Sequence, residues 1–228
     1  MNLLGLLMSF GMVHTTTDPA LRYLALGDSY TIGESVATEE RWPALLVDKL
    51  RRRGIHIEDP RYVATTGWTT DELSAGMDRA DLEPCWDLVS LLIGVNNQYR
   101  GRSVEDYRVE YRALLERAIN LAGDDPDRVF VLSIPDWAMT PFGEASDRDL
   151  ERMSREIDVY NAAKREITED RGVLFFDITP STRKLPADRA LAAEDGLHPS
   201  GKLYGRWVEQ IERTLADRIN QFTPCPRP

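Results

Sequence analysis

Short apolar runs alternate with longer amphipathic segments along most of the chain, and this alternation constrains the fold more than any other feature. The runs typical of strands span residues 21–26, 61–64, 87–93, 129–134 and 173–177. Apolar residues recur at three- and four-residue steps, as in helices, over residues 41–53, 69–79, 103–122, 149–169 and 200–219. Continuous apolar strands that alternate with helices predict one parallel sheet covered by helices on both faces.

Polar and glycine-containing segments follow these strands at the places where open α/β sheets bind ligands, the carboxyl ends. The segments are Gly27-Asp28-Ser29-Tyr30, Thr66-Gly67-Trp68, Gly94-Val95-Asn96-Asn97 and, before the last helix, Asp195-Gly196-Leu197-His198-Pro199. Because the carboxyl ends of parallel strands meet at one edge of a sheet, we expect the four segments to form a single site.

The residue types in these segments suit nucleophilic catalysis. A serine hydroxyl such as Ser29 is a weak nucleophile and needs a base within hydrogen-bond reach. His198 is the one histidine that this topology would bring near Ser29. Its second ring nitrogen needs an acceptor, and Asp195 lies three residues earlier in the same loop. We therefore expect Ser29, His198 and Asp195 to be catalytic.

A reaction of this kind also needs donors for the oxyanion of a tetrahedral intermediate. The Ser29 backbone N–H can donate, and a Gly67 N–H can approach closely because glycine has no Cβ. The side-chain amide of Asn96 would be the third donor. Asp28 is expected to order the Ser29 turn by bonding to nearby backbone amides.

The order Gly-Asp-Ser, isolated Gly, Gly-x-Asn and Asp-x-x-His resembles the GDSL/SGNH hydrolase family, from about Leu21 to the last helix. The resemblance implies a three-layer α/β/α, flavodoxin-like fold with a five-stranded parallel sheet. It also implies ester hydrolysis through an acyl-serine intermediate, with neither metal nor organic cofactor. In this likeness Ser29 is the nucleophile, His198 the base and then the acid, and Asp195 orients His198. Ser29, Gly67 and Asn96 form the oxyanion hole.

Two positions depart from the family pattern. The first motif has Tyr30 in place of Leu, and Asn97 follows Asn96 where the family more often has Asp. Neither change removes a catalytic atom, but both are expected near the pocket and leave the substrate open. Aromatic residues flank the predicted loops and are candidates for lining that pocket. They are Tyr30, Trp68, Tyr99, Trp137 and Phe142.

Composition excludes several other classes of function. The chain of 228 residues carries 28 basic and 38 acidic side chains, a formal net charge of −10. Such a surface repels phosphate backbones and anionic lipid, so we expect no nucleic-acid or membrane partner. With two cysteines and three histidines in no clustered pattern, we expect no metal site. The expected partner is a small-molecule ester, and the protein is expected to be a monomer or a dimer.

The ends of the chain and its cysteines bear on organisation and compartment. We expect an N-terminal extension over residues 1–17, one hydrolase-like domain over 18–220 and a Pro-rich tail over 221–228. The apolar run Leu3 to Val13 is too short to span a bilayer and is either a weak signal-like segment or the result of a mis-assigned start before Met12. Cys85 is expected to be a buried or half-buried thiol and Cys225 an exposed, unpaired one. Unpaired cysteines favour the cytoplasm, whereas a signal peptide in 1–17 would indicate secretion or a periplasmic location.

Several functions compete on this pattern. Within the hydrolases, the substrate is a simple ester or lysophospholipid with a small to moderate acyl group, an acetylated carbohydrate or a thioester. Outside the enzymes, the chain would be a non-catalytic flavodoxin-like binding module. A flavin-binding protein is a third class, although no run of Ser and Thr suited to phosphate follows the first strand.

Overall fold

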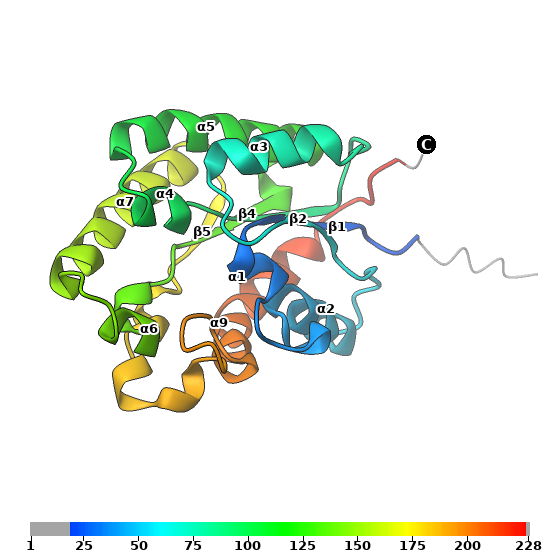
Figure 1. Ribbon diagram of the computed structural model, residues 1–228. Coiled ribbons are helices and arrows are strands. Elements are labelled where there is room, and N and C mark those ends of the chain that lie inside the picture. Colours follow the sequence, from blue (N-terminus) through cyan, green and yellow to red (C-terminus); the bar gives the residue numbers. More distant parts are fainter. Residues whose placement is uncertain (1–18, 227–228) are drawn as a thin grey trace, which may run out of the picture.

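The sheet of the protein is parallel throughout. A computed structural model describes residues 19–226 of the chain. Its strands pair in the order β2-β1-β3-β4-β5, which is the flavodoxin-like order. Figure 1 shows the sheet in the middle of the molecule, with helices on either side. The strands are β1 (Tyr23–Gly27), β2 (Arg61–Ala64), β3 (Leu88–Leu92), β4 (Val129–Leu132) and β5 (Leu174–Phe176). The predicted five-stranded parallel sheet is therefore confirmed.

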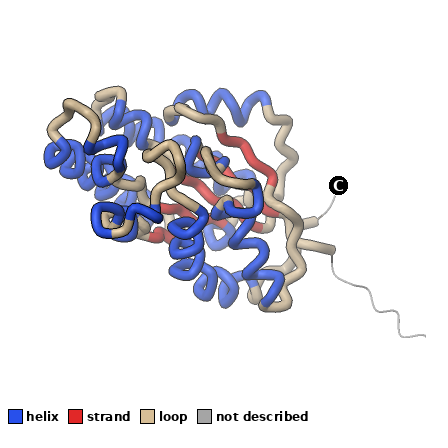
Figure 2. Tube along the Cα trace, turned by 60° about the horizontal axis from the view of Figure 1, so that its bottom comes forward, coloured by secondary structure: helices blue, strands red, loops and turns tan. Residues whose placement is uncertain are grey.

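Long helices cover both faces of the sheet, as predicted. One layer contains α2 (Trp42–Arg52) and α9 (Gly201–Ile219), and the other contains α3 (Thr70–Arg79), α5 (Val104–Leu121) and α7 (Leu150–Asp170). Figure 2 shows the strands between these two layers. The apolar stripe of each helix faces the sheet, and burial of this stripe is the main source of helix stability in a folded protein. The three-layer α/β/α architecture is thus confirmed.

Three of the long helices, α3, α5 and α7, begin at residues whose side chains bond to the first turn. The Glu72 carboxylate accepts a hydrogen bond from the Thr69 backbone N–H at 2.9 Å, as the predicted capping pattern requires. Ser103 and Asp149 each accept a hydrogen bond from a backbone N–H three residues ahead. Among residues 19–226, no helix is long and apolar enough to cross a membrane.

Short helices fill the loops, and the sequence pattern did not predict them. The α-helices are α1 (Ser29–Ile32), α4 (Val95–Tyr99), α6 (Pro141–Glu144) and α8 (Thr179–Thr182). The 3₁₀ turns are η1 (Thr38–Glu40), η2 (Pro126–Arg128), η3 (Trp137–Met139), η4 (Leu185–Ala187) and η5 (Arg189–Leu191). Each spans five residues or fewer, which is too short to show helical periodicity.

The strand order reverses between β1 and β3, and a crevice for ligands opens at such a point. In the sheet, β1 lies between β2 and β3 and is parallel to both. The segments that follow β1 and β3 therefore leave the sheet side by side. Gly27, at the end of β1, allows α1 to start close to the sheet. A Cβ there would lie 2.1 Å from Thr31 Oγ1 and 2.4 Å from the Leu92 carbonyl oxygen. The sheet thus places Ser29 and Asn96 next to each other.

The two cysteines form a disulfide, so the prediction of two unpaired thiols is wrong. Cys85 and Cys225 are bonded across a sequence separation of 140 residues. Cys225 is only 3% exposed, and its backbone N–H donates to Asp87 at 2.6 Å. Local composition suggested an exposed tail, but a long-range covalent link cannot be inferred from composition. The predicted reducing compartment depended on unpaired cysteines and loses that support.

We expect removal of the disulfide by the double substitution Cys85→Ala/Cys225→Ala to lower the free energy of unfolding by roughly 2–5 kcal/mol. The physical reason is the long loop, whose closure restricts the unfolded chain. Denaturant unfolding with and without dithiothreitol measures the effect. Reductant should destabilise the wild type and leave the double variant unchanged. An unfolding midpoint of the wild type that does not move under reducing conditions would contradict this account.

Candidate active site

Ser29 lies at the first position of α1, directly after β1, and is 5% exposed. Asp28 caps this helix: its Oδ1 accepts a hydrogen bond from the Tyr30 backbone N–H at 3.1 Å. This contact confirms the expectation that Asp28 orders the Ser29 turn. No acceptor among the described residues takes the Ser29 backbone N–H. The turn therefore presents the Ser29 hydroxyl together with an unused donor at the carboxyl edge of the sheet.

His198 and Asp195 form a compact unit just before α9. His198 Nδ1 lies 2.6 Å from Asp195 Oδ2, and Asp195 Oδ1 accepts the backbone N–H groups of Leu197 at 2.9 Å and His198 at 3.0 Å. These bonds fix the turn and the orientation of the imidazole. With Nδ1 held by a carboxylate, Nε2 is the nitrogen left for a substrate or nucleophile.

Asp195 has a further partner that sequence reasoning missed. The Ser35 hydroxyl donates to Asp195 Oδ2 at 2.6 Å. Burial on its own would raise the pKa of Asp195, but the bonds from Ser35, His198 and the two backbone amides outweigh it and hold the pKa well below its usual range. Asp195 is therefore ionised at neutral pH. No motif marks Ser35, because it is 160 residues away along the chain.

One hydrogen bond links the two loops that carry Asn96 and Gly67, two of the candidate oxyanion donors. Asn96 Nδ2 donates to the Trp68 carbonyl at 2.9 Å, which ties the loop after β3 to the loop after β2. Gly67, in that second loop, has φ of +81°, a conformation that residues with a Cβ rarely adopt. No acceptor among residues 19–226 takes the Gly67 N–H. Ser29, Gly67 and Asn96 thus each retain a polar hydrogen for a ligand.

Ser29, Asn96 and His198 share one cavity of about 190 Å³. The other residues that line it are mostly apolar or aromatic: Tyr30, Val95, Tyr99, Trp137, Phe142 and Leu197. Four of the five aromatic residues named as pocket candidates are in this lining. Gly67 and Asp195 are not in its lining: Asn96 bonds to the carbonyl of Trp68, the residue after Gly67, and His198 bonds to Asp195. No cluster of three or more His, Cys, Asp or Glu that could hold a metal occurs in residues 19–226.

Trp68 and Asn97 lie elsewhere than the sequence suggested. Trp68 is not in the lining of the cavity but packs against Gly76, where an added Cβ would lie 2.3 Å from the indole. Asn97 is fully buried and faces α3: its Oδ1 accepts from the Thr70 backbone N–H at 3.1 Å and its Nδ2 donates to Thr70 Oγ1 at 2.6 Å. Asn97 therefore joins α4 to α3 and does not line the pocket.

Tyr30, the other departure from the family pattern, does line the cavity. Its ring centroid is 5.3 Å from that of His198, and the side chain is 3% exposed. Burial, reinforced by the negative charge of Asp28, raises the pKa of Tyr30 far above its ordinary value. Tyr30 is thus a neutral wall beside the imidazole, not an acid–base group.

A buried lysine lies beneath the site, and it is the second residue that sequence reasoning missed. Lys164, on α7, is fully buried and donates to the Ile93 carbonyl at 3.1 Å, directly before the Gly94–Asn96 loop. Burial lowers the pKa of Lys164 to about 7, while the charge of Asp28 opposes the change. Burial likewise raises the pKa of Asp28 to about 7, opposed by the Tyr30 N–H and by Lys164. The two charges stabilise each other below Ser29.

The pair predicts an unusual dependence of stability on pH. A raised Asp28 pKa means that the fold loses stability as the pH rises from about 4 to 7. A lowered Lys164 pKa means that it regains stability as the pH rises from 7 to about 10. The variant Asp28→Asn/Lys164→Met lacks both charges. Its free energy of unfolding should exceed that of the wild type by up to about 4 kcal/mol near pH 7, and by less at pH 5 and 9.

Urea unfolding at the three pH values measures this difference. Lys164→Met by itself is the control: without the lysine, the fold should no longer regain stability above pH 7, while the loss of stability caused by the raised pKa of Asp28 remains. Wild-type and double-variant stabilities that run parallel from pH 5 to 9 would contradict the burial of two coupled charges.

Comparison with solved structures shows the same fold elsewhere. The structure of TesA is 18% identical with a TM-score of 0.65, over 86% of this chain and 99% of TesA. The psychrotrophic esterase EstA from Pseudoalteromonas sp. is 18% identical with a TM-score of 0.62, over 88% of this chain and 99% of that one. An acetylxylan esterase from Geobacillus stearothermophilus is 21% identical with a TM-score of 0.61, over 89% of this chain and 95% of that one.

Sequence comparison gives the family. No curated protein sequence matches the chain. The family model of the GDSL-like lipases and acylhydrolases matches residues 25–206, which include Ser29, Gly67, Asn96, Asp195 and His198. This protein therefore belongs to the GDSL-like lipase/acylhydrolase family and is a carboxylic-ester hydrolase.

Proposed function

We propose that the protein hydrolyses esters through an acyl-serine intermediate on Ser29. In the first half of the reaction, His198 Nε2 takes the proton of the Ser29 hydroxyl while Oγ bonds to the ester carbonyl carbon. Collapse of the tetrahedral intermediate breaks the bond to the alcohol oxygen, which leaves with the proton from His198. In the second half, water gives a proton to His198 and bonds to the acyl carbon. Collapse of this second tetrahedral intermediate breaks the bond to Ser29 Oγ, which takes the proton back from His198, and the acid is released.

Three donors stabilise the oxyanion in this proposal. They are the backbone N–H groups of Ser29 and Gly67 and the second N–H of the Asn96 amide, whose first N–H is bonded to Trp68. Asp195 stabilises the imidazolium that forms on His198 in both halves. Because Asp195 accepts four hydrogen bonds and keeps a low pKa, it holds its charge throughout the cycle.

One observation favours catalysis over the other candidate functions. The His198–Asp195 bond of 2.6 Å orients an imidazole into the same small cavity that Ser29 and Asn96 line. A binding module has no need of a carboxylate-oriented histidine beside a serine at a helix start. This combination supports catalysis over the non-catalytic flavodoxin-like module and over flavin binding.

We expect Ser29→Ala to lower kcat for p-nitrophenyl acetate by several orders of magnitude, because the acceptor of the acyl group is lost. A fluorophosphonate probe should label wild-type Ser29 and fail to label the variant. Ser74→Ala, in α3 and outside the lining of the cavity, is the matched control and should keep both activity and labelling. Labelling at another residue, or a Ser29→Ala variant with wild-type turnover, would refute the nucleophile.

The cavity favours a small acyl group. Its volume of about 190 Å³ is below the 300–1,000 Å³ of pockets that enclose drug-sized ligands. Tyr30, Trp137 and Phe142 form part of its walls. The name of the Geobacillus neighbour, an acetylxylan esterase, agrees with an acetyl group but leaves the alcohol open. We therefore propose an acetyl- to butyryl-sized acyl group, in preference to the long chains of a lysophospholipid.

A series of p-nitrophenyl esters from acetate to dodecanoate tests the acyl size. We expect kcat/KM to be highest for two to four carbons and to fall steeply beyond them, since a longer chain cannot enter the cavity. Trp137→Ala should move the optimum to longer chains by removing a wall. Peracetylated xylose and acetyl-coenzyme A, in parallel, compare the carbohydrate and thioester alternatives. An optimum at eight or more carbons in the wild type would exclude a small acyl pocket.

The disulfide bears on where the enzyme works. Disulfides persist in oxidising compartments and are rare in a reducing cytoplasm. We propose an oxidising location, in place of the cytoplasmic one favoured by the cysteine count. Residues 1–17, which would carry a targeting signal, lie outside the described residues.

A further inference from the structure

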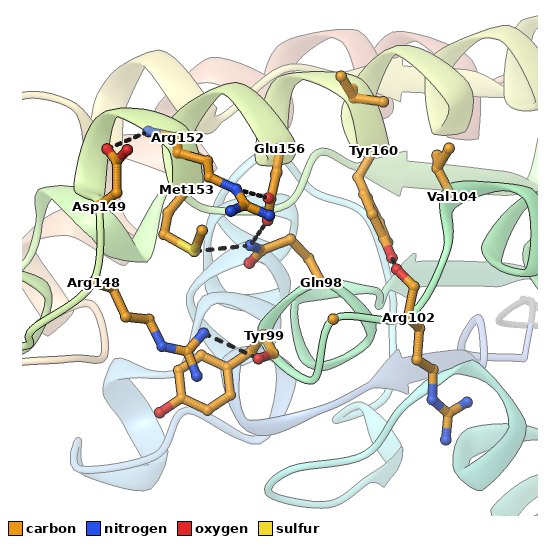
Figure 3. A pocket seen from close by; sticks show the side chains of 12 residues that line it. Gln98, Tyr99, Arg102, Val104, Arg148, Asp149, Arg152, Met153, Glu156 and Tyr160 are labelled. Atoms are coloured by element: carbon orange, nitrogen blue, oxygen red, sulfur yellow. Dashed lines mark hydrogen bonds and ion pairs between the residues drawn. The ribbon is translucent and has the colours of Figure 1, made fainter.

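A second hollow adjoins the catalytic cavity and has no role in the reaction as described. It is a groove of about 560 Å³ between the turn from α4 to α5 and the first half of α7 (Figure 3). Tyr99 lines both the groove and the catalytic cavity. Gln98 joins their walls, because it accepts a hydrogen bond from Trp137 Nε1 at 2.9 Å and donates to Glu156 at 2.8 Å. A ligand longer than the cavity would pass Tyr99 into this groove.

Arg148 lies at the junction of the two hollows. Its guanidinium carbon is 4.1 Å from the centroid of the Tyr99 ring and 5.5 Å from that of Trp137. One guanidinium N–H donates to the Tyr99 backbone carbonyl at 3.1 Å, as Figure 3 shows. Tyr99 and Trp137 are both walls of the catalytic cavity. The aromatic stack and the hydrogen bond hold the cation at the exit from the cavity.

The other two arginines of the groove are already paired with carboxylates. Arg152 pairs with Glu156 at 2.8 Å, and Arg102 pairs with Asp71 at 2.6 Å. The Asp149 carboxylate caps α7 by accepting the Arg152 backbone N–H. In contrast, Arg148 has no carboxylate partner among residues 19–226. It is the cation of this groove that remains available to an anionic ligand.

We propose that the groove binds the alcohol portion of the ester and that Arg148 binds an anionic group on that portion, a carboxylate or a phosphate. The inference rests on the proposed function, because it assigns the small acyl group to the catalytic cavity. With the acyl group there, the alcohol portion leaves past Tyr99, where Arg148 meets it. The planar guanidinium offers paired N–H donors that match either oxyanion. Arg148 is thus a specificity-determining residue and takes no part in the proton transfers.

Three aryl acetates test this assignment. Methyl 4-acetoxybenzoate is neutral, 4-acetoxybenzoate carries a carboxylate, and 4-acetoxyphenyl phosphate carries a phosphate. The measured quantity is the kcat/KM of each anionic ester divided by that of the neutral ester. We expect Arg148→Gln to lower this ratio by about tenfold to a hundredfold through KM, as expected for loss of hydrogen bonds to a charged group. The anionic ester whose kcat/KM ratio falls more in Arg148→Gln shows whether a carboxylate or a phosphate is the preferred anion.

Two further variants separate a specific contact from a general effect of charge. Arg213→Gln, on α9 and outside the lining of both hollows, removes the same charge and should leave the ratio unchanged. Arg148→Lys keeps the charge without the paired donors, and its kcat/KM ratio should lie between those of the wild type and Arg148→Gln. A ratio that Arg148→Gln leaves unaltered, or that Arg213→Gln lowers equally, would overturn the proposal.

The neutral ester distinguishes this failure from failure of the proposed function. If the wild type hydrolyses methyl 4-acetoxybenzoate through a labelled Ser29 but Arg148→Gln does not change the ratio, only the assignment of the groove is wrong. If the wild type hydrolyses no acetate and Ser29 is unlabelled, the proposed reaction itself is wrong and the assignment of the groove falls with it.

Discussion

The pairing of β1 with β3 is the constraint on which the rest of the structure depends. Residues from Tyr23↔Leu88 to Gly27↔Leu92 lie in parallel register, although β2 comes between the two strands in the chain. This pairing brings the ends of β1 and β3 together at the sheet edge where the strand order reverses. The Ser29 turn and the Asn96 loop both leave the sheet there. Every contact of the candidate site is built onto that shared edge.

The Asp195 carboxylate connects the two sides of the site across a long stretch of chain. It accepts hydrogen bonds from Ser35, which follows α1, and from the loop that carries His198. The same group therefore orients the imidazole and attaches the His198 loop to the segment that follows Ser29. Four hydrogen bonds offset the cost of its partial burial and keep it charged. Asp195 therefore stabilises the local structure as well as the orientation of His198.

The long elements could be predicted from sequence because their periodicity extends over many residues, as in α5 and α7. The candidate site could be predicted because its residue types follow strands of known direction. Contacts distant in sequence could not: the Cys85–Cys225 disulfide and the Ser35–Asp195 bond leave no local pattern. The burial of Lys164 could be recognised from the sequence, since it continues the apolar stripe of α7 four residues after Tyr160. A lysine on a buried stripe is a signal for a buried charge.

The disulfide and the candidate site lie at opposite ends of the strands. Cys85 precedes the amino end of β3, and the cavity opens beyond the carboxyl ends. Oxidation of the cysteines thus acts on the lifetime of the enzyme and not on the rate at which each folded molecule turns over. In the presence of reductant, total activity would fall because fewer molecules are folded, while kcat and KM of the folded molecules stay the same. Total activity would then report the redox history of the surroundings.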